Sequence, residues 1–188
     1  MIKIGITGSL ASGKTTASKI LSYRRGPVFS ADKAVSELYQ NKKFRFMICK
    51  KFKIKNNNQI KKNIKELILK KKSNLKKLEK LIHPLVRKKM RKFTAQNKKK
   101  KIVFYEIPLL IESKLMNIFK IIIFIRSKKK LRLKRFKSKG GDKKLFNLLN
   151  DLQMGDQKKI KFCDYVVVNE KNIMILKKNL STIMAKYE

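Results

Sequence analysis

A glycine-rich segment directly behind an apolar run limits what this chain can fold into. Residues 8–15 read Gly-Ser-Leu-Ala-Ser-Gly-Lys-Thr and follow the run Met1–Ile6. This is the phosphate-binding loop pattern G-x-x-x-x-G-K-[ST], with a strand expected before it and a helix after it. We therefore expect a nucleoside triphosphate site where a first strand leads into a first helix. The alternative, a chance glycine-rich turn, is much less frequent for the full motif in this context.

Each residue type in this segment suits the binding of a polyphosphate. Gly8 and Gly13 allow the backbone to turn its N–H groups inward and to approach the phosphates closely. The N-terminus of the following helix adds free N–H groups and the positive end of its dipole. Lys14 supplies a mobile charge for the β and γ phosphates, and the Thr15 hydroxyl is a ligand for Mg²⁺. The segment therefore predicts a bound triphosphate with magnesium.

The charge balance of the chain is extreme. Its 188 residues, enough for one domain with a substantial core, hold 51 Lys and Arg against 12 Asp and Glu, a net charge of +39. Such a balance suggests a polyanionic partner. The lysines, however, are spread through the chain rather than confined to one segment. We therefore favour compositional drift over a dedicated nucleic-acid partner, while expecting the field to attract small anionic substrates.

The cysteines, the single histidine and the hydropathy of the chain exclude several further classes of protein. Cys49 and Cys163 have no metal-ligand spacing around them, so two reduced thiols are expected. A single histidine rules out a histidine-rich metal site. The longest wholly apolar run, Ile121–Ile125, is far shorter than the about 20 residues that span a bilayer. Because Met1 leads straight into the first expected strand, no targeting segment is expected, and we predict a cytoplasmic, soluble protein.

The apolar runs predict an α/β fold. Beyond the first strand, four runs read as strands connected by helical segments: Val28–Ser30, Ile102–Tyr105, Ile121–Ile125 and Tyr165–Val168. We expect a five-stranded parallel sheet with right-handed crossovers and flanking helices, closed by a helix over about 173–184. The expected organisation is a single domain, 1–188, with a core of about 1–39, 102–126 and 163–188, a helical region of about 40–101 and a lid of about 127–162.

The helical region has one interruption. It contains no glycine, and apolar residues recur at three and four spacing, as in the stripe Leu75, Leu78, Ile82 and Leu85. His83-Pro84 lies inside this stripe, so a helix is expected to begin or kink there. His83 is either a packed or capping residue or a substrate contact, and the local sequence does not choose between these.

Two carboxylates follow expected strands. Ligands bind beyond the carboxyl ends of parallel strands, so Asp32, just after Val28–Ser30, would face the same crevice as the phosphate loop. Its equally weighted alternative is the N-cap of the helix through Ala34, Val35 and Leu38. Glu106 ends the strand that begins at Ile102 and is expected to hold the hydration shell of Mg²⁺, with a surface carboxylate as the alternative.

A cationic segment follows the fourth expected strand. Residues 127–139 are dense in Lys and Arg and end at Gly140-Gly141. A basic helical hairpin in this position could close over ATP and neutralise charge on the transferred phosphoryl group. Arg135 is the preferred candidate because arginine can hold phosphate bidentately, although a solvated basic face is nearly as good an explanation for any single residue.

Taken in order, these residues resemble the dephospho-coenzyme A kinases. The segments that carry the resemblance are Gly5–Gly8 leading into the phosphate loop, Ser30-Ala31-Asp32, Leu78-Glu79 with His83-Pro84, Pro108–Glu112, Arg135, Gln153 and Cys163–Asn169. The resemblance covers nearly the whole chain. Many families share the loop, but the loop, the aspartate, His-Pro and P-L-L-x-E in this order are fairly specific.

The resemblance implies transfer of the ATP γ-phosphoryl group to the ribose 3′-hydroxyl of dephospho-coenzyme A, the last step of coenzyme A biosynthesis. Asp32 would accept or orient the hydroxyl proton, while Lys14, Arg135 and Mg²⁺ would stabilise phosphate charge. The residues implied for ATP are Gly8, Ala11, Ser12, Gly13, Lys14, Thr15, Thr16, Arg135 and Asn169. Those implied for the acceptor are Asp32, His83, Pro108 and Leu109, and those for the metal are Thr15 and Glu106.

Four positions depart from the family's usual pattern. Ser30 and Glu106 stand where aspartates are common, Lys139 where a second lid arginine is common, and Arg132 where glutamine is frequent. These departures bear on metal and phosphate handling more than on the reaction. The alternatives are another small-molecule or nucleoside monophosphate kinase of this fold, or a nucleotide-switched nucleic-acid-binding protein with cations segregated on one surface. No membrane partner is expected, and the protein would be a monomer or small homo-oligomer.

Overall fold

The computed structural model describes residues 1–187, which form two compact units. One unit combines Met1–Ser30 with the chain from Asn97 onward, and the other is Ala31–Gln96. The second unit begins with the helix that follows the second strand, earlier than the expected boundary near residue 40, because that helix packs on the long helix of its own unit. The expected single-domain organisation stays a prediction.

The first unit is built on a five-stranded parallel sheet, as the apolar runs predicted. The strands are β1 (Ile2–Gly8), β2 (Val28–Ser30), β3 (Ile102–Glu106), β4 (Ile121–Arg126) and β5 (Tyr165–Val168), in the order β2-β3-β1-β4-β5. The register pairs Ile6 with Glu106 and Gly8 with Ile125. The central strand β1 therefore delivers the glycine-rich segment to the carboxyl edge of the sheet.

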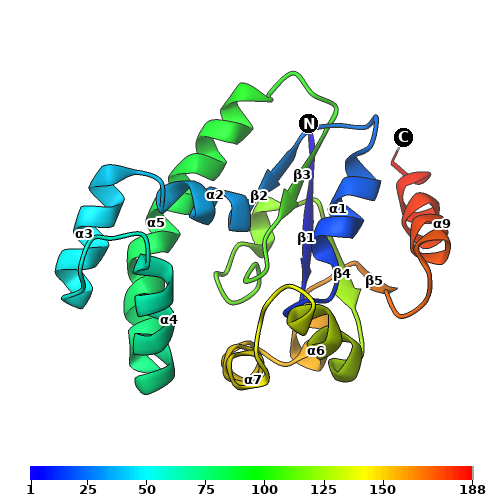
Figure 1. Ribbon diagram of the computed structural model, residues 1–188. Helices are drawn as coiled ribbons and strands as arrows, with labels where there is room; N and C mark the ends of the chain where they lie inside the picture. Colours follow the sequence, from blue (N-terminus) through cyan, green and yellow to red (C-terminus); the bar gives the residue numbers. More distant parts are fainter. Residues whose placement is uncertain (188) are drawn as a thin grey trace. The chain divides into compact units, whose positions relative to one another are not determined.

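Two helices cover one face of this sheet, α1 (Lys14–Ser22) and α9 (Ile173–Met184) (Figure 1). Ala17 and Leu21 of α1 and Leu180 of α9 are fully buried in the same cluster as Ile4 and Ile6 of β1. At about 25 cal/mol for each Å² of apolar surface buried, such a cluster is the main stabilising contribution to the unit. It fixes α1, and therefore the end of the phosphate loop, against the strands.

The segment after β3 packs on the other face of β1. A Cβ atom added to Gly5 would lie 2.8 Å from Leu110 Cδ1 and 3.1 Å from Phe119 Cγ, so a larger residue there would require these side chains to shift. The short helix η1 (Met116–Ile118) leads this segment into β4. Its packing holds Pro108 and the residues around it near the carboxyl ends of β1 and β3.

The cationic segment forms helices, as predicted. α6 (Lys129–Lys137) is followed by α7 (Lys143–Leu152), which Asp142 caps through a 2.7 Å bond from Leu145 N to its Oδ1, and then by α8 (Asp156–Ile160). Phe136 of α6 and Phe146 of α7 hold the pair together, with ring centroids 5.6 Å apart. The connection between β4 and β5 is thus a packed helical segment.

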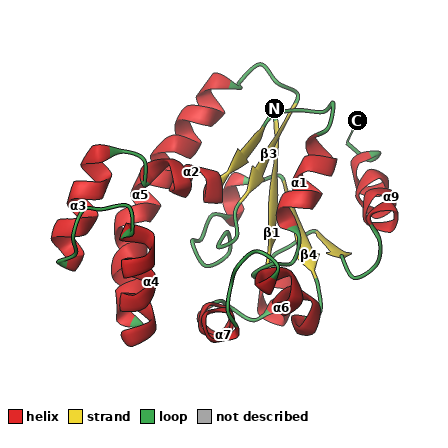
Figure 2. Cartoon of the chain, viewed as in Figure 1, coloured by secondary structure: helices red, strands yellow, loops and turns green. Residues whose placement is uncertain are grey.

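Within Ala31–Gln96 the described residues are helical or in loops, and no strand is present (Figure 2). The helices are α2 (Ala31–Leu38), α3 (Lys42–Phe52), α4 (Ile60–Lys70) and α5 (Ser73–Gln96). The expectation that a helix begins at His83-Pro84 is wrong, because α5 runs through Pro84. Leu78, Ile82 and Met90 are buried on both sides of the proline, and this packing compensates for the backbone hydrogen bond that proline removes.

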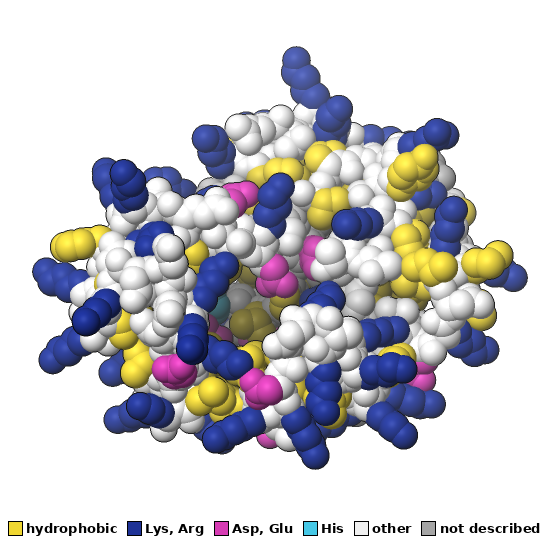
Figure 3. Space-filling model, viewed as in Figure 1, with side chains coloured by type: hydrophobic (Ala, Val, Ile, Leu, Met, Phe, Trp, Pro, Cys, Tyr) yellow, Lys and Arg dark blue, Asp and Glu magenta, His cyan; other side chains and the backbone are white. Residues whose placement is uncertain are grey.

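Cationic side chains are scattered over the face drawn in Figure 3 and do not gather into a stripe there. That distribution agrees with a compositional origin of the charge. No helix among residues 1–187 is long and apolar enough to cross a membrane.

Candidate functional site

The backbone of the phosphate loop requires its two glycines. Gly8 has φ 149°, and an added Cβ would lie 2.4 Å from Ile125 O of the neighbouring strand. Gly13 has φ 97°, and an added Cβ would lie 2.1 Å from Asn169 Nδ2. Ala11 adopts a left-handed φ of 57°, a conformation that costs an alanine about 1–2 kcal/mol. The loop therefore keeps one conformation because its neighbours impose it.

Buried polar groups line this loop. Lys14 is 7 % exposed, and its Nζ donates to the carbonyls of Gly8 (3.1 Å) and Ser9 (2.9 Å). Ser12 is fully buried, and its Oγ has no hydrogen-bond partner within residues 1–187. A buried hydroxyl without a partner is costly, and a phosphate oxygen would accept from it. These groups fit a bound polyphosphate.

The carboxylate of Glu106 lies against the start of α1. Glu106 is 2 % exposed, and its two oxygens accept from Thr15 Oγ1 at 2.5 Å and Ser18 Oγ at 3.3 Å. No group of three His, Cys, Asp or Glu side chains suited to a metal occurs in residues 1–187. Mg²⁺ usually takes one or two carboxylates together with substrate phosphates and water, so a hydroxyl and one carboxylate are a suitable donor set.

Arg135 and Asn169 contact the loop at Ser12. Arg135 Nη1 donates to Ser12 O at 3.2 Å, and Asn169 Nδ2 donates to the same oxygen at 2.9 Å. Arg135 also bonds Ser127 Oγ and Asn169 O. Burial lowers the pKa of the Arg135 guanidinium, and the charge of Glu170 opposes this shift. Arg135 of α6 and Asn169, the residue after β5, therefore meet at the phosphate loop, while their contact with ATP stays a prediction.

Three residues from the region after β4 also contact the loop's tip. The sequence had singled out Arg132 and Gln153 without placing them at the loop, and it gave no indication for Asp156. Arg132 Nη1 donates to Leu10 O, and Leu10 N donates to Gln153 Oε1, each at 3.2 Å. Ser9 Oγ hydrogen-bonds Asp156 Oδ1. These pairs are separated by 122, 143 and 147 residues, so no local spacing could reveal them.

The P-L-L-x-E segment, Pro108–Glu112, contacts both the region after β4 and the end of β1. Glu112 Oε1 lies 2.7 Å from the fully buried Lys159 Nζ of α8 and accepts from Met154 N at 3.2 Å. Pro108 is half-buried, and its carbonyl accepts from Thr7 Oγ1 at 3.1 Å. Pro108 and the half-buried Leu109 thus lie beside the end of β1, while their contact with an acceptor stays a prediction.

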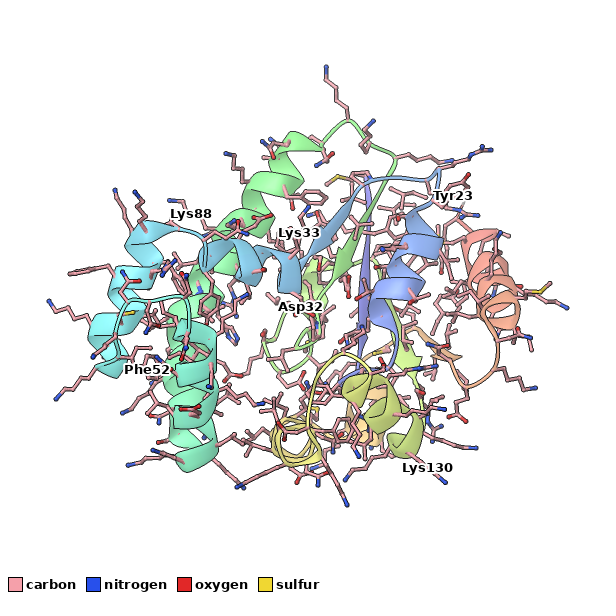
Figure 4. The ribbon with its side chains drawn as sticks, viewed as in Figure 1. Tyr23, Asp32, Lys33, Phe52, Lys88 and Lys130 are labelled. Carbon is pink, nitrogen blue, oxygen red and sulfur yellow. The ribbon has the colours of Figure 1, made fainter. Side chains whose placement is uncertain are left out.

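The remaining predicted site residues have simpler surroundings. Thr16 is an exposed residue in the first turn of α1. Asp32 and the half-buried His83 belong to the second unit, in α2 and α5. The N-cap alternative for Asp32 is wrong, because α2 begins at Ala31 and Asp32 already lies in its first turn (Figure 4). A carboxylate there still interacts favourably with the helix dipole.

Comparison with known proteins agrees with this geometry. The family model for dephospho-CoA kinase matches residues 2–174. A curated dephospho-CoA kinase of Rickettsia bellii is 31% identical over 189 residues, which cover 100% of this chain and 98% of that protein. Two solved structures share the fold at 24% identity. TT1252 from Thermus thermophilus has a TM-score of 0.80, with 100% and 98% of the two chains covered. The dephospho-CoA kinase from Campylobacter jejuni has a TM-score of 0.65, with 99% and 97% covered. The chain belongs to the dephospho-CoA kinase family.

Proposed function

We propose that this protein transfers the γ-phosphoryl group of ATP to the ribose 3′-hydroxyl of dephospho-coenzyme A. The observation that carries the proposal is the phosphate loop itself, in which Lys14 is held among loop carbonyls and Thr15 is bonded to Glu106. Membership of the dephospho-CoA kinase family supports the choice of acceptor. The proposed cellular site is the cytoplasm, and the proposed assembly a monomer or small homo-oligomer.

The donor half of the site binds ATP through the loop. The proposed contacts are made by the backbone of residues 8–15, the Ser12 and Thr16 hydroxyls, Lys14, Arg135 and Asn169. Thr15 and Glu106 would hold Mg²⁺, which supplies charge neutralisation at the β and γ phosphates. Lys14 exchanges its loop carbonyls for phosphate oxygens, and Arg135 stabilises charge on the transferred group. Positioning and electrostatics provide most of the rate enhancement in such a transfer.

The acceptor half is proposed to centre on Asp32. Asp32 is the second residue after Ser30, which ends β2 and pairs in register with Glu106. Its carboxylate accepts or orients the proton of the 3′-hydroxyl. His83, Pro108 and Leu109 are the proposed further acceptor contacts.

The direct test is turnover of dephospho-coenzyme A with Mg-ATP by the purified full chain. Asp32→Asn is expected to lower kcat by about 100-fold or more, since general-base catalysis contributes about 10²–10⁴-fold, while ATP binding is unchanged. A coupled assay for ADP gives kcat, and calorimetry gives the ATP dissociation constant.

Glu37→Gln is the matched control for this test. Glu37 lies on the same helix, and its carboxylate pairs with Lys89 at 2.5 Å in an exposed position. This variant should keep wild-type turnover. If Asp32→Asn kept the wild-type rate, the role of Asp32 would be wrong. If the wild-type protein phosphorylated other acceptors but not dephospho-coenzyme A, the acceptor would be wrong.

A further inference from the structure

The peptide groups of Leu10 are held from both sides by side chains of the region after β4. Its N–H donates to Gln153 Oε1, and its C=O accepts from Arg132 Nη1, each at 3.2 Å. The neighbouring Ser9 hydroxyl donates to Asp156. The N–H belongs to the Ser9–Leu10 peptide unit and the C=O to the Leu10–Ala11 unit, so each of the two units that flank the Leu10 Cα is restrained by one hydrogen bond. The tip of the phosphate loop is therefore fixed from outside the loop.

Arg132 is itself fixed in place. It is 6 % exposed, and its Nε donates to Ser127 O at 3.1 Å, while Nη1 also donates to Asn150 Oδ1 at 2.8 Å. The guanidinium carbon lies 5.7 Å from the centroid of the Phe146 ring. Burial lowers the pKa of the guanidinium and the charge of Asp156 opposes this, but an arginine remains protonated throughout the neutral range.

We infer that Arg132 and Gln153 are a positioning pair for the phosphate loop. The pair acts on ATP through the two peptide units on either side of the Leu10 Cα and does not touch the nucleotide. The inference rests on the proposed function of the loop. Ala11, the next residue, has the left-handed φ of 57° that an unconstrained alanine avoids. Fixing the two peptide units that flank Leu10 keeps the adjoining N–H groups in the phosphate-binding arrangement before ATP arrives. Pre-organisation of this kind lowers the entropy cost of binding.

This role predicts a defined pattern of kinetic change. Replacing Arg132→Met removes the guanidinium but keeps an apolar side chain of similar length against Phe146. The dissociation constant of Mg-ATP and the KM for ATP should each rise about tenfold, as expected for loss of a hydrogen bond from a charged group. At saturating ATP, kcat should stay within about twofold of the wild-type value, because the phosphate contacts are restored once ATP is bound.

Three further variants separate positioning from loss of charge or of stability. Lys130→Met removes the same charge from the same helix at an exposed position (Figure 4) and should leave the KM for ATP unchanged. Arg132→Lys keeps the charge but lacks the planar set of donors, so its KM should lie between those of Arg132→Met and the wild type. Asn150→Ala, at a half-exposed site, removes one acceptor of Arg132 and should raise the KM by a smaller factor.

The Leu10 amide provides a readout that does not depend on turnover. In ¹⁵N-labelled protein without nucleotide, its resonance should shift in Arg132→Met and in Gln153→Met but not in Lys130→Met. Wild-type ATP affinity in Arg132→Met would overturn the inference, as would an equal loss in Lys130→Met. If Arg132→Met does not fold, an unchanged KM and Leu10 resonance in Asn150→Ala and Gln153→Met would overturn it. If the wild-type chain itself does not bind ATP, the proposed function fails instead.

Discussion

Gly13 is one of the two glycines at which the phosphate loop tolerates little change. A methyl group there would lie 2.1 Å from Asn169 Nδ2, and its φ of 97° is unfavourable for any other residue. Gly13→Ala should lower the free energy of unfolding by about 2 kcal/mol or more, from backbone strain together with overpacking, and should weaken ATP binding. Chemical denaturation and calorimetry measure the two effects.

Gly155→Ala is the control for that substitution. Gly155 precedes α8 with φ −61°, and an added Cβ meets no atom within 4 Å. Its cost should stay within about 1 kcal/mol, the range of an exposed N-cap change. Equal losses in the two variants would mean that the contact with Asn169 is not what restricts position 13.

Cys163 is expected to be chemically inert in the folded protein. Burial, and then the neighbouring charge of Asp164, raises the pKa of its thiol to about 12, although Lys159 opposes the shift. Because the folded pKa is raised, the thiol stays protonated at pH 8, and the thiolate is the reactive form. In a Cys49→Ser background, iodoacetamide should label Cys163 far more slowly in native than in unfolded protein at pH 8. Comparable rates would contradict the raised pKa.

At the scale of elements, Pro84 is the clearest conflict between sequence and structure. It lies exposed in the interior of α5, where proline is about 3 kcal/mol less favourable than alanine. Pro84→Ala should therefore raise the free energy of unfolding by about 1–3 kcal/mol. Chemical denaturation tests this, with Lys88→Ala on the same helix expected to stay within about 0.5 kcal/mol. A fall in stability would mean that the proline relieves strain in α5.

A stabilised Pro84→Ala variant also tests why the proline is present. A lower kcat or a higher KM for dephospho-coenzyme A would indicate that the local geometry at His83 matters for the acceptor. Unchanged kinetics would leave Pro84 without a functional role in α5.

The elements that sequence predicted well are those whose pattern is local. Runs such as Ile121–Ile125 indicate strands because both of their faces are buried, and the loop motif identifies the start of α1. The contacts of Arg132, Gln153 and Asp156 with the loop depend on how α6, α7 and α8 fold back, which no local pattern encodes. The place of the phosphate loop between β1 and α1 was therefore predictable from sequence, whereas the residues that hold its tip required the structure.

At the scale of the whole molecule, the charge is a cost to stability. The chain has 51 Lys and Arg for 12 Asp and Glu, so most cations have no carboxylate to pair with. Repulsion among like charges destabilises the compact state more than the expanded one. The fold must therefore be stabilised chiefly by its apolar clusters, with ion pairs such as Lys159–Glu112 contributing locally.

This balance predicts that salt stabilises the protein. The Debye length falls from about 30 Å at 0.01 M to about 8 Å at 0.15 M, so moderate NaCl screens the repulsion among exposed cations. The midpoint of thermal unfolding should rise over this range and then level off. The rise should be about 2–4 °C for each kcal/mol added to the free energy of unfolding. Lys14→Ala should show the same rise, because screening does not depend on an anion bound in the phosphate loop. If the midpoint does not change with salt, charge repulsion must destabilise the unfolded chain as much as the folded one. If the rise disappears in Lys14→Ala, the effect is caused by anion binding at the loop.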